Sequence, residues 1–172
     1  MGRRRPVLRF VLLAGALWGL FELFFVACIL ESKAFRSFLS FNAELAGVVI
    51  RTLGHEVRVT GQSMLGSGFA MEVKYGCDGI QPVGLFVAIL MAFPATKRAK
   101  VAGAVLGSLV LLTVNLVRII TLFFTGIYLR KLFEILHADV WQAIFILTAL
   151  LLWVVWAWWA TGDRTRRVYA SP

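Results

Sequence analysis

Four long apolar stretches decide what this chain of 172 residues can fold into. An α-helix rises about 1.5 Å per residue, so a helix needs about 20 apolar residues to cross the hydrocarbon core of a bilayer. Hydrophobic residues make up 60% of the chain, more than a soluble domain buries in its core. The sequence therefore predicts an all-α membrane protein, a four-transmembrane-helix bundle. The predicted spans are Val7–Leu30, Ile80–Pro94 (extending to residues 78–95), Val101–Tyr128 and Val140–Ala160.

The basic residues predict how the spans are oriented. The net charge is +9, but the basic residues form three separate clusters beside the spans, unlike the single basic patch of a nucleic-acid-binding protein. The positive-inside rule makes all three clusters cytoplasmic, which requires an even number of spans and cytoplasmic termini. We expect a multi-pass protein of a bacterial cytoplasmic (inner) membrane, with a permanent first span rather than a cleaved signal. The clusters are Arg3, Arg4, Arg5 and Arg9; Lys97, Arg98 and Lys100; and Arg164, Arg166 and Arg167.

The segment between the first two spans, residues 31–77, is predicted to lie outside the membrane. Within it, Ala34–Leu53 has the period of an amphipathic surface helix, with Phe38, Phe41, Leu45 and Val49 on its apolar face. Glu56–Thr60 and Phe69–Tyr75 alternate polar and apolar residues around Gly66-Ser67-Gly68, which predicts a small β-hairpin. We find no linker, so residues 1–172 are expected to form a single integral membrane domain.

Cys77 is the first candidate for chemistry, because it stands where the strand pattern changes to a helical one. A thiol at a helix N-terminus lies near the positive end of the helix dipole and near free backbone N–H groups, which favours a thiolate nucleophile. Gly76 and Gly79 are expected to let a substrate backbone approach closely. The alternative is a structural cysteine that only packs.

Arg118 lies inside the third apolar stretch, where an unpaired arginine costs about 2.5–3.5 kcal/mol. It is about 25 Å along the helix from Val101, which places it at the level of Cys77. Asn115, one turn earlier on the same face, is expected to orient the guanidinium or to bind a substrate amide. The alternative is a structural ion pair or an arginine that extends to the membrane surface.

Glu22 is the acid that we expect to pair with Arg118, since the four apolar stretches contain no other carboxylate. It lies about 22 Å along the first span from Val7, close to the depth of Arg118. A buried carboxylate and a buried guanidinium are each less costly when paired. The alternative is that Glu22 is protonated or opens onto a water-filled cleft.

His137 falls in a predicted exterior loop, Leu129–Asp139, directly before the fourth span. An imidazole with an ordinary pKa of about 6.5 can exchange protons with a thiol or a leaving amine. His55 is the rival histidine, but it has no surrounding motif. Nucleophile, proton carrier and cation together make a thiol acyl-transfer site. No metal or organic cofactor is implied, because Cys and His do not recur at ligand spacing.

Three segments together resemble the exosortase and archaeosortase family of membrane cysteine transpeptidases, in particular the compact exosortase H type. They are Gly76-Cys77-Asp78-Gly79-Ile80, Asn115-Leu116-Val117-Arg118-Ile119, and His137-Ala-Asp-Val-Trp141-Gln142-Ala143, in the family's order. The resemblance runs from about Phe69 to Trp156.

The resemblance implies a function. Such enzymes cleave a C-terminal sorting signal, made of a short motif, a transmembrane helix and a basic tail, and transfer the new C-terminus to an acceptor. Cys77 would be the nucleophile, Arg118 the stabilising cation and His137 the acid/base. From the residues themselves rather than from the resemblance, we expect Asn115, Glu22, Asp78 and Gly79 to support them, with Asp78 raising the pKa of the neighbouring thiol. The partners implied are membrane-anchored protein substrates and the lipid bilayer, without nucleic acid.

Two other functions fit the same residues. One is a non-enzymatic membrane scaffold or assembly factor, whose Arg118 pairs only within the protein. The other is a thiol redox protein that uses Cys28 and Cys77 as a disulfide pair in an oxidising compartment. Cys28, near the end of the first span, is otherwise a packing residue.

Overall fold

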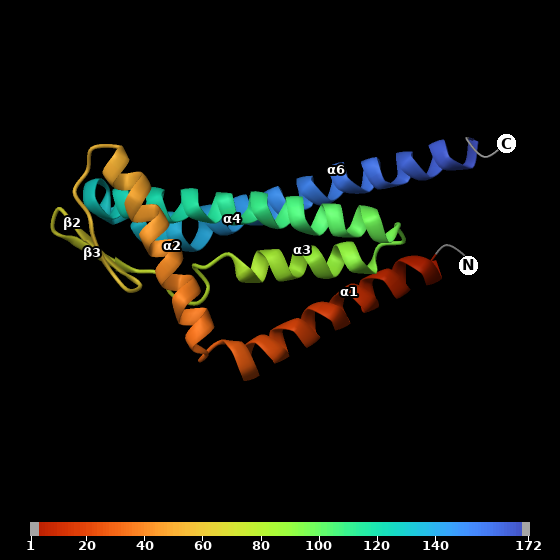
Figure 1. Ribbon diagram of the computed structural model, residues 1–172, viewed down its shortest axis with the longest axis horizontal. Coiled ribbons are helices and arrows are strands. Elements are labelled where there is room, and N and C mark those ends of the chain that lie inside the picture. The colour runs from red at the N-terminus through yellow and green to blue at the C-terminus, as the bar shows by residue number, and fades with distance from the viewer. Residues whose placement is uncertain (1–3, 170–172) are drawn as a thin grey trace.

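The computed structural model describes residues 4–169, and it is a helical bundle that carries a small cap at one end (Figure 1). The bundle helices are α1 (Arg4–Phe24), α3 (Ile80–Ala92), α4 (Lys97–Tyr128) and α6 (Trp141–Tyr169). The first residues of α1, the α3–α4 connection and the last turn of α6 share one end, here named the terminal end. Helix α2 and the strands form the opposite, sheet end.

Three helical segments in the described part of the chain are long and apolar enough to cross a membrane. They are Arg5–Ile29, Lys97–Tyr128 and Arg130–Gly162. Helix α3 has only 13 residues, fewer than the roughly 20 that a full crossing needs. It packs against α1, α4 and α6 and so forms the centre of the bundle. The predicted helical fold is thus confirmed, and three helices rather than four have the length and apolar composition to cross a membrane.

Glycines let the bundle helices approach each other closely. The ring of Phe21 occupies the space that a side chain on Gly84 would need. In the same way, the Trp156 ring lies against Gly103 and the Phe86 ring lies against Gly107. Small residues are favoured in membrane bundles because helices gain packing there rather than hydrophobic transfer. The indole N–H of Trp156 also donates a 2.8 Å hydrogen bond to the Ala99 carbonyl, which ties α6 to the first turn of α4.

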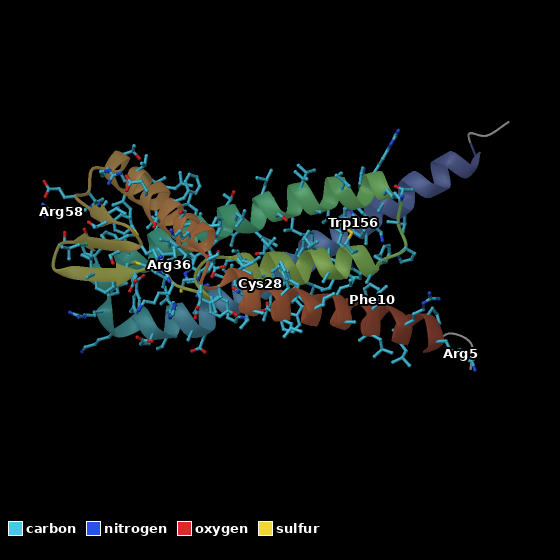
Figure 2. All side chains as sticks on the ribbon, turned by 60° about the horizontal axis from the view of Figure 1, so that its bottom comes forward. Arg5, Phe10, Cys28, Arg36, Arg58 and Trp156 are labelled. Atoms are coloured by element: carbon cyan, nitrogen blue, oxygen red, sulfur yellow. The ribbon has the colours of Figure 1, made fainter. Side chains whose placement is uncertain are left out.

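The basic clusters that the structure describes gather at the terminal end. Arg5 lies at the start of α1, and Arg58 of β1 lies at the opposite end of the molecule (Figure 2). Lys97 and its neighbours, which were predicted to lie between two spans, make the first turn of α4, which Thr96 caps by accepting from the Ala99 N–H. Arg3 is outside the described residues.

The predicted amphipathic helix is confirmed as α2 (Lys33–Thr52), which begins where the Ser32 hydroxyl accepts from the Phe35 N–H at 3.1 Å. Its packed face differs from the prediction, because Phe41 and Leu45 are exposed. The residues that α2 buries against α4 and the sheet lie on a neighbouring face of the helix, and most of them are smaller than the residues of the predicted face. They are Phe35, Leu39, Asn42, Ala43, Ala46, Gly47 and Ile50.

The predicted hairpin is a three-stranded antiparallel sheet in the order β1 (Arg58–Thr60), β2 (Ser63–Gly66) and β3 (Phe69–Glu72). The two predicted strands therefore do not pair with each other, because β2 lies between them. The two-residue turn after β2 has positive φ at both Ser67 and Gly68, as tight hairpin turns require. This short second strand was missed because its polar and apolar residues do not alternate over a full strand length.

The segment before α6, predicted to be a loop, is helical. It consists of a 3₁₀ turn (Arg130–Leu132), the short α5 (Phe133–Ile135) and a π-helical turn (Leu136–Val140) that continues into α6. The segment contains no glycine or proline to break the helix. His137 is consequently held on a π-turn, a feature that is frequent at functional sites.

Candidate active site

The loop Gly76–Gly79 joins β3 to α3 and presents Cys77. Gly76 and Gly79 have φ values of 85° and 81°, which residues with a side chain rarely adopt. A Cβ on Gly79 would lie 3.0 Å from the Asn115 Cβ. Gly79 therefore lets the loop lie against α4 of the same protein, whereas the sequence had predicted room for a substrate.

Asp78 holds this loop in shape. Its side chain is completely buried, and its two oxygens accept 2.8 Å hydrogen bonds from the backbone N–H groups of Gly76 and Ile80. Ile80 is the first residue of α3, so the carboxylate also lies at the positive end of a helix dipole. Asp78 thus fixes the positions of the residues on both sides of Cys77.

Cys77 and His137 are in direct contact. The Cys77 Sγ lies 3.0 Å from Nε2 of His137. The imidazole is held by stacking on Phe133, one turn earlier, with ring centroids 5.7 Å apart and an angle of 15° between the planes. The thiol can therefore pass its proton to His137 without any rearrangement of the protein.

Arg118 reaches the same point from α4 and is 6% exposed. Its Nη1 donates to the Gly76 carbonyl at 3.2 Å, and its Nη2 donates to the His137 carbonyl at 3.3 Å and lies 3.8 Å from the Cys77 Sγ. The guanidinium carbon also lies 5.6 Å from the centre of the Phe145 ring. One cation thus joins the loop, the π-turn and α6 around the sulfur.

The guanidinium keeps one donor unused. Arg118 Nε is buried and has no hydrogen-bond partner among the described residues. Asn115, one turn away, donates from Nδ2 to the Cys77 carbonyl at 3.2 Å, while its buried Oδ1 has no such partner. A free donor and a free acceptor beside a thiol are suited to bind a peptide group, because buried polar groups otherwise remain unsatisfied at a cost.

The pKa of the Cys77 thiol is raised above its ordinary value, mainly by burial. The Arg118 cation opposes this increase, and the Asp78 carboxylate adds to it. The sequence had predicted that the start of the helix would favour a thiolate, but burial raises the pKa of this thiol. The resting site therefore holds a thiol and relies on His137 to take the proton.

The predicted ion pair between Glu22 and Arg118 is wrong. In the described part of the chain, salt bridges join Arg51 to Glu44 and Lys74 to Glu72, and Arg118 takes part in neither. Arg118 is satisfied instead by carbonyl groups that only the folded loop and π-turn bring to it.

Glu22 belongs to a separate polar group on the α1 side of the loop. The pKa of Tyr75 is raised by burial first and then by the charges of Glu22 and Asp78, while Gln81 lowers it through a side-chain hydrogen bond. Glu22 and Gln81 therefore both lie beside the Tyr75 hydroxyl. Tyr75 and Gln81 were not singled out as site residues, although Gln81 stands in the first turn of α3, four residues after Cys77.

The remaining candidates lie apart from this site. Cys28 is exposed and unpaired, and Cys77 is also a free thiol, so the disulfide that the redox interpretation needs is not formed. His55 packs edge-on against Phe124, with ring centroids 4.9 Å apart, at the end of α2. The described residues contain no group of three or more His, Cys, Asp or Glu side chains placed to hold a metal ion.

The site thus combines a thiol, an imidazole that contacts it, and a buried guanidinium beside both. These groups come from three segments that are far apart in the sequence. Comparison of the chain with protein-family models, with curated proteins and with solved structures finds no match.

Proposed function

We propose that this protein is a membrane-embedded cysteine peptidase or transpeptidase of the exosortase type, which cleaves membrane-anchored proteins and transfers the new C-terminus to an acceptor. The observation that carries the proposal is the 3.0 Å contact between the Cys77 sulfur and His137 Nε2, with the Arg118 guanidinium beside it. A buried arginine without a carboxylate partner favours the formation of negative charge nearby, on sulfur or on a substrate oxygen.

The proposed reaction begins when His137 Nε2 takes the thiol proton and the Cys77 sulfur attacks a peptide carbonyl carbon. Arg118 and backbone N–H groups stabilise the oxyanion that forms. The C–N bond then breaks, the departing nitrogen receives the proton from His137, and a thioester remains on Cys77. Water or an acceptor with an amine or hydroxyl group attacks the thioester and gives its proton to His137. The C–S bond breaks, and the Cys77 thiolate takes this proton back from His137.

The proposed orientation follows from charge. The terminal end carries Arg5, Arg9, Lys97, Arg98 and Lys100, so this end faces the cytoplasm of a bacterial cell and the sheet end faces outward. Helix α3 completes the four spans in this arrangement and is the second in chain order. Its 13 residues cover about 20 Å, and its neighbours on both sides shield the flanking backbone from lipid. Cys77 then opens to the outer surface, where exported proteins arrive.

N-terminal proteomics of the membrane fraction tests this function. Cells without the native gene would express the wild-type protein, Cys77→Ala, Cys77→Ser or the matched control Cys28→Ala. We expect new protein N-termini just before a C-terminal membrane helix with wild type and Cys28→Ala, and their loss in both Cys77 variants. Equal yields of these N-termini from the Cys77→Ala protein would exclude the cysteine mechanism and favour the scaffold function.

A further inference from the structure

The backbone turn that carries Cys77 is tightly closed. The Cys77 N–H donates a 2.9 Å hydrogen bond to the Lys74 carbonyl, so Tyr75 and Gly76 are the two central residues of the turn. The φ of 85° at Gly76 suits the third position of a type II turn, which favours glycine. Gly76 also supplies the carbonyl to which Arg118 donates at 3.2 Å. The position of the sulfur relative to the guanidinium therefore depends on how this turn is held.

The side chain of Tyr75 extends from this turn to α1. Its ring stacks on Phe25, in the π-helical turn Phe25–Ile29 that follows α1, with ring centroids 5.8 Å apart and an angle of 22° between the planes. Phe25 is buried and lies edge-on against Phe35 of α2, so it offers a fixed surface. Figure 1 shows the segment between β3 and α3 passing close to the junction of α1 and α2. The Tyr75 ring thus ties the Cys77 turn to that junction.

The Tyr75 hydroxyl lies against Glu22 of α1 and Gln81 of α3. Glu22 precedes Phe25 by three residues, so the ring and the hydroxyl of Tyr75 meet the same face of one helix. A carboxylate only accepts hydrogen bonds, so the phenol gives its one proton to Glu22 and accepts from the Gln81 amide. These three side chains, here named the tyrosine bridge, connect α1 and α3 to the Cys77 turn.

We propose that Tyr75 is a positioning residue, whose hydroxyl holds the Cys77 turn between α1 and α3 and so keeps the sulfur in contact with His137. The inference rests on the proposed function, because it concerns the same thiol. The Sγ–Nε2 distance is 3.0 Å, and a shift of about 1 Å would lengthen it beyond a useful hydrogen bond. A misplacement of this size can lower a catalytic rate about 100-fold. Glu22 then serves the site through Tyr75 rather than through Arg118.

The reactivity of the thiol reports whether the turn is held. In the described part of the chain, the charged or titratable groups that face the sulfur are Arg118 of α4, Asp78 of the loop and His137 of the π-turn. Burial raises the pKa of Cys77 more than the Arg118 cation lowers it, so the net shift is upward. A turn released from its place weakens all of these influences together, and the pKa then returns towards its ordinary value of 9.0. Loss of the Tyr75 hydroxyl should therefore speed alkylation of the thiol.

Alkylation of the purified protein tests the positioning role directly. Each protein carries Cys28→Ser and reacts with iodoacetamide in detergent at pH 8, and mass spectrometry follows the modification of Cys77. Tyr75→Phe, which removes only the hydroxyl, should react about three-fold faster than the parent, equivalent to about half a pKa unit. A loss of overall stability would not change this rate while the protein stays folded. Size-exclusion chromatography of each variant checks folding.

Tyr128→Phe is the matched control for the loss of a phenol hydroxyl. Tyr128 is exposed at the end of α4, and its ring stacks on Phe124. It lies outside the tyrosine bridge, so Tyr128→Phe should be alkylated at the parent rate.

Variants of Glu22 separate hydrogen bonding from packing. Glu22→Gln keeps an oxygen that accepts from the phenol, so its alkylation and its processing in cells should stay close to the parent values. Glu22→Leu removes the acceptor and should match Tyr75→Phe, with the yield of new N-termini about ten-fold lower in both. The double variant Tyr75→Phe/Glu22→Leu should react no faster than either single variant, since each removes the same interaction.

Three results would overturn the inference. They are a parent-like alkylation rate in Tyr75→Phe, an equal change in Tyr128→Phe, and effects of Tyr75→Phe and Glu22→Leu that multiply in the double variant. The alkylation test needs no substrate, so it is independent of the proposed function. Faster alkylation of Tyr75→Phe, with no new N-termini in cells that express the parent, would remove the peptidase function alone. New N-termini together with parent-like alkylation of Tyr75→Phe would remove the positioning role alone.

Discussion

The Cys77 sulfur and His137 Nε2 lie 3.0 Å apart, although 60 positions separate the two residues in the chain. The contact depends on two local structures. The Asp78 carboxylate holds the Cys77 loop through its hydrogen bonds to Gly76 and Ile80, and a π-turn stacked on Phe133 holds the imidazole. Both structures precede a bundle helix at the same end of the molecule, so their side chains meet there.

His137→Gln should lower processing by a factor of about 100 or more, because a positioned general base contributes about 10²–10⁴-fold. Glutamine keeps a polar side chain of similar reach but cannot carry the proton. The yield of new N-termini per unit of membrane protein measures the effect. His55→Gln is the control, since His55 packs on Phe124 and should be dispensable. Equal losses in both variants would contradict the role of His137.

Arg118→Lys should reduce processing sharply even though the charge is kept. The guanidinium donates to two carbonyl groups from Nη1 and Nη2 and also lies beside the sulfur, which the single ammonium group of lysine cannot reproduce. The same proteomic readout applies, with detergent size-exclusion chromatography as the control for folding. Wild-type processing by the lysine variant would show that charge alone is sufficient.

Alkylation of Cys77 by iodoacetamide should rise with pH through a midpoint above the ordinary thiol value of 9.0, because burial raises its pKa. The reactive thiolate is scarce below that midpoint and accumulates above it. Arg118→Gln removes a cation that lowers this pKa, so its midpoint should be higher still and its rate at pH 8 several-fold lower, about ten-fold per pKa unit. Mass spectrometry in a Cys28→Ser background measures the rate. A midpoint below that of free cysteine would contradict the dominant effect of burial.

Gly79→Ala should destabilise the protein by about 1–3 kcal/mol, since alanine at φ 81° is strained and its Cβ would meet Asn115. Thermal unfolding in detergent should show the lower melting temperature. The matched control is Gly19→Ala, which sits in a regular helix with open space around it and should be neutral or slightly stabilising. Equal melting temperatures for Gly79→Ala and the wild type would show that the loop relaxes away from α4.

Glu22→Gln and Arg118→Gln should have additive effects on stability in detergent, because the two side chains form no ion pair. The double mutant should match the sum of the single losses to within about 0.5 kcal/mol. Unfolding by denaturant, with a helical signal followed throughout, measures all four proteins. A coupling of more than about 1 kcal/mol would mean that the residues interact in solution after all.

The sequence alone determined the apolar character and most of the helical segments. Bilayer thickness sets how long an apolar stretch must be, and the helical period sets how apolar residues are spaced along an amphipathic helix. The bounds of α2 agree to within one residue with the predicted helix, since a capping serine and an amphipathic period mark its limits. That Arg118 reaches the level of Cys77 also followed from counting residues along one helix. These are local properties that depend on a single segment.

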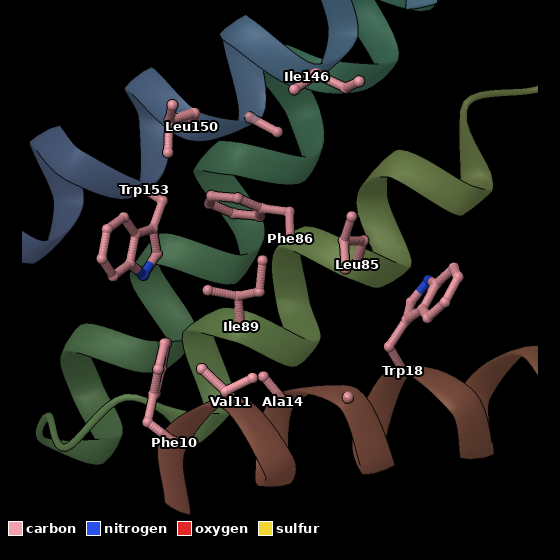
Figure 3. Close-up of a pocket in the computed structure, with 12 residues that line it drawn as sticks. Phe10, Val11, Ala14, Trp18, Leu85, Phe86, Ile89, Ile146, Leu150 and Trp153 are labelled. Atoms are coloured by element: carbon pink, nitrogen blue, oxygen red, sulfur yellow. The ribbon is translucent and has the colours of Figure 1, made fainter. Parts of the chain in front are cut away.

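Only the tertiary structure decided which polar groups form hydrogen bonds with each other. Arg118 binds backbone carbonyls at Gly76 and His137 rather than the carboxylate of Glu22, because a shared depth does not fix the rotation of two helices about their axes. Burial raises the pKa of Cys77, which the sequence could not show because the extent of desolvation depends on neighbours from distant segments. The apolar groove between α1, α3 and α6 exists for the same reason, because three helices must come together to form it (Figure 3).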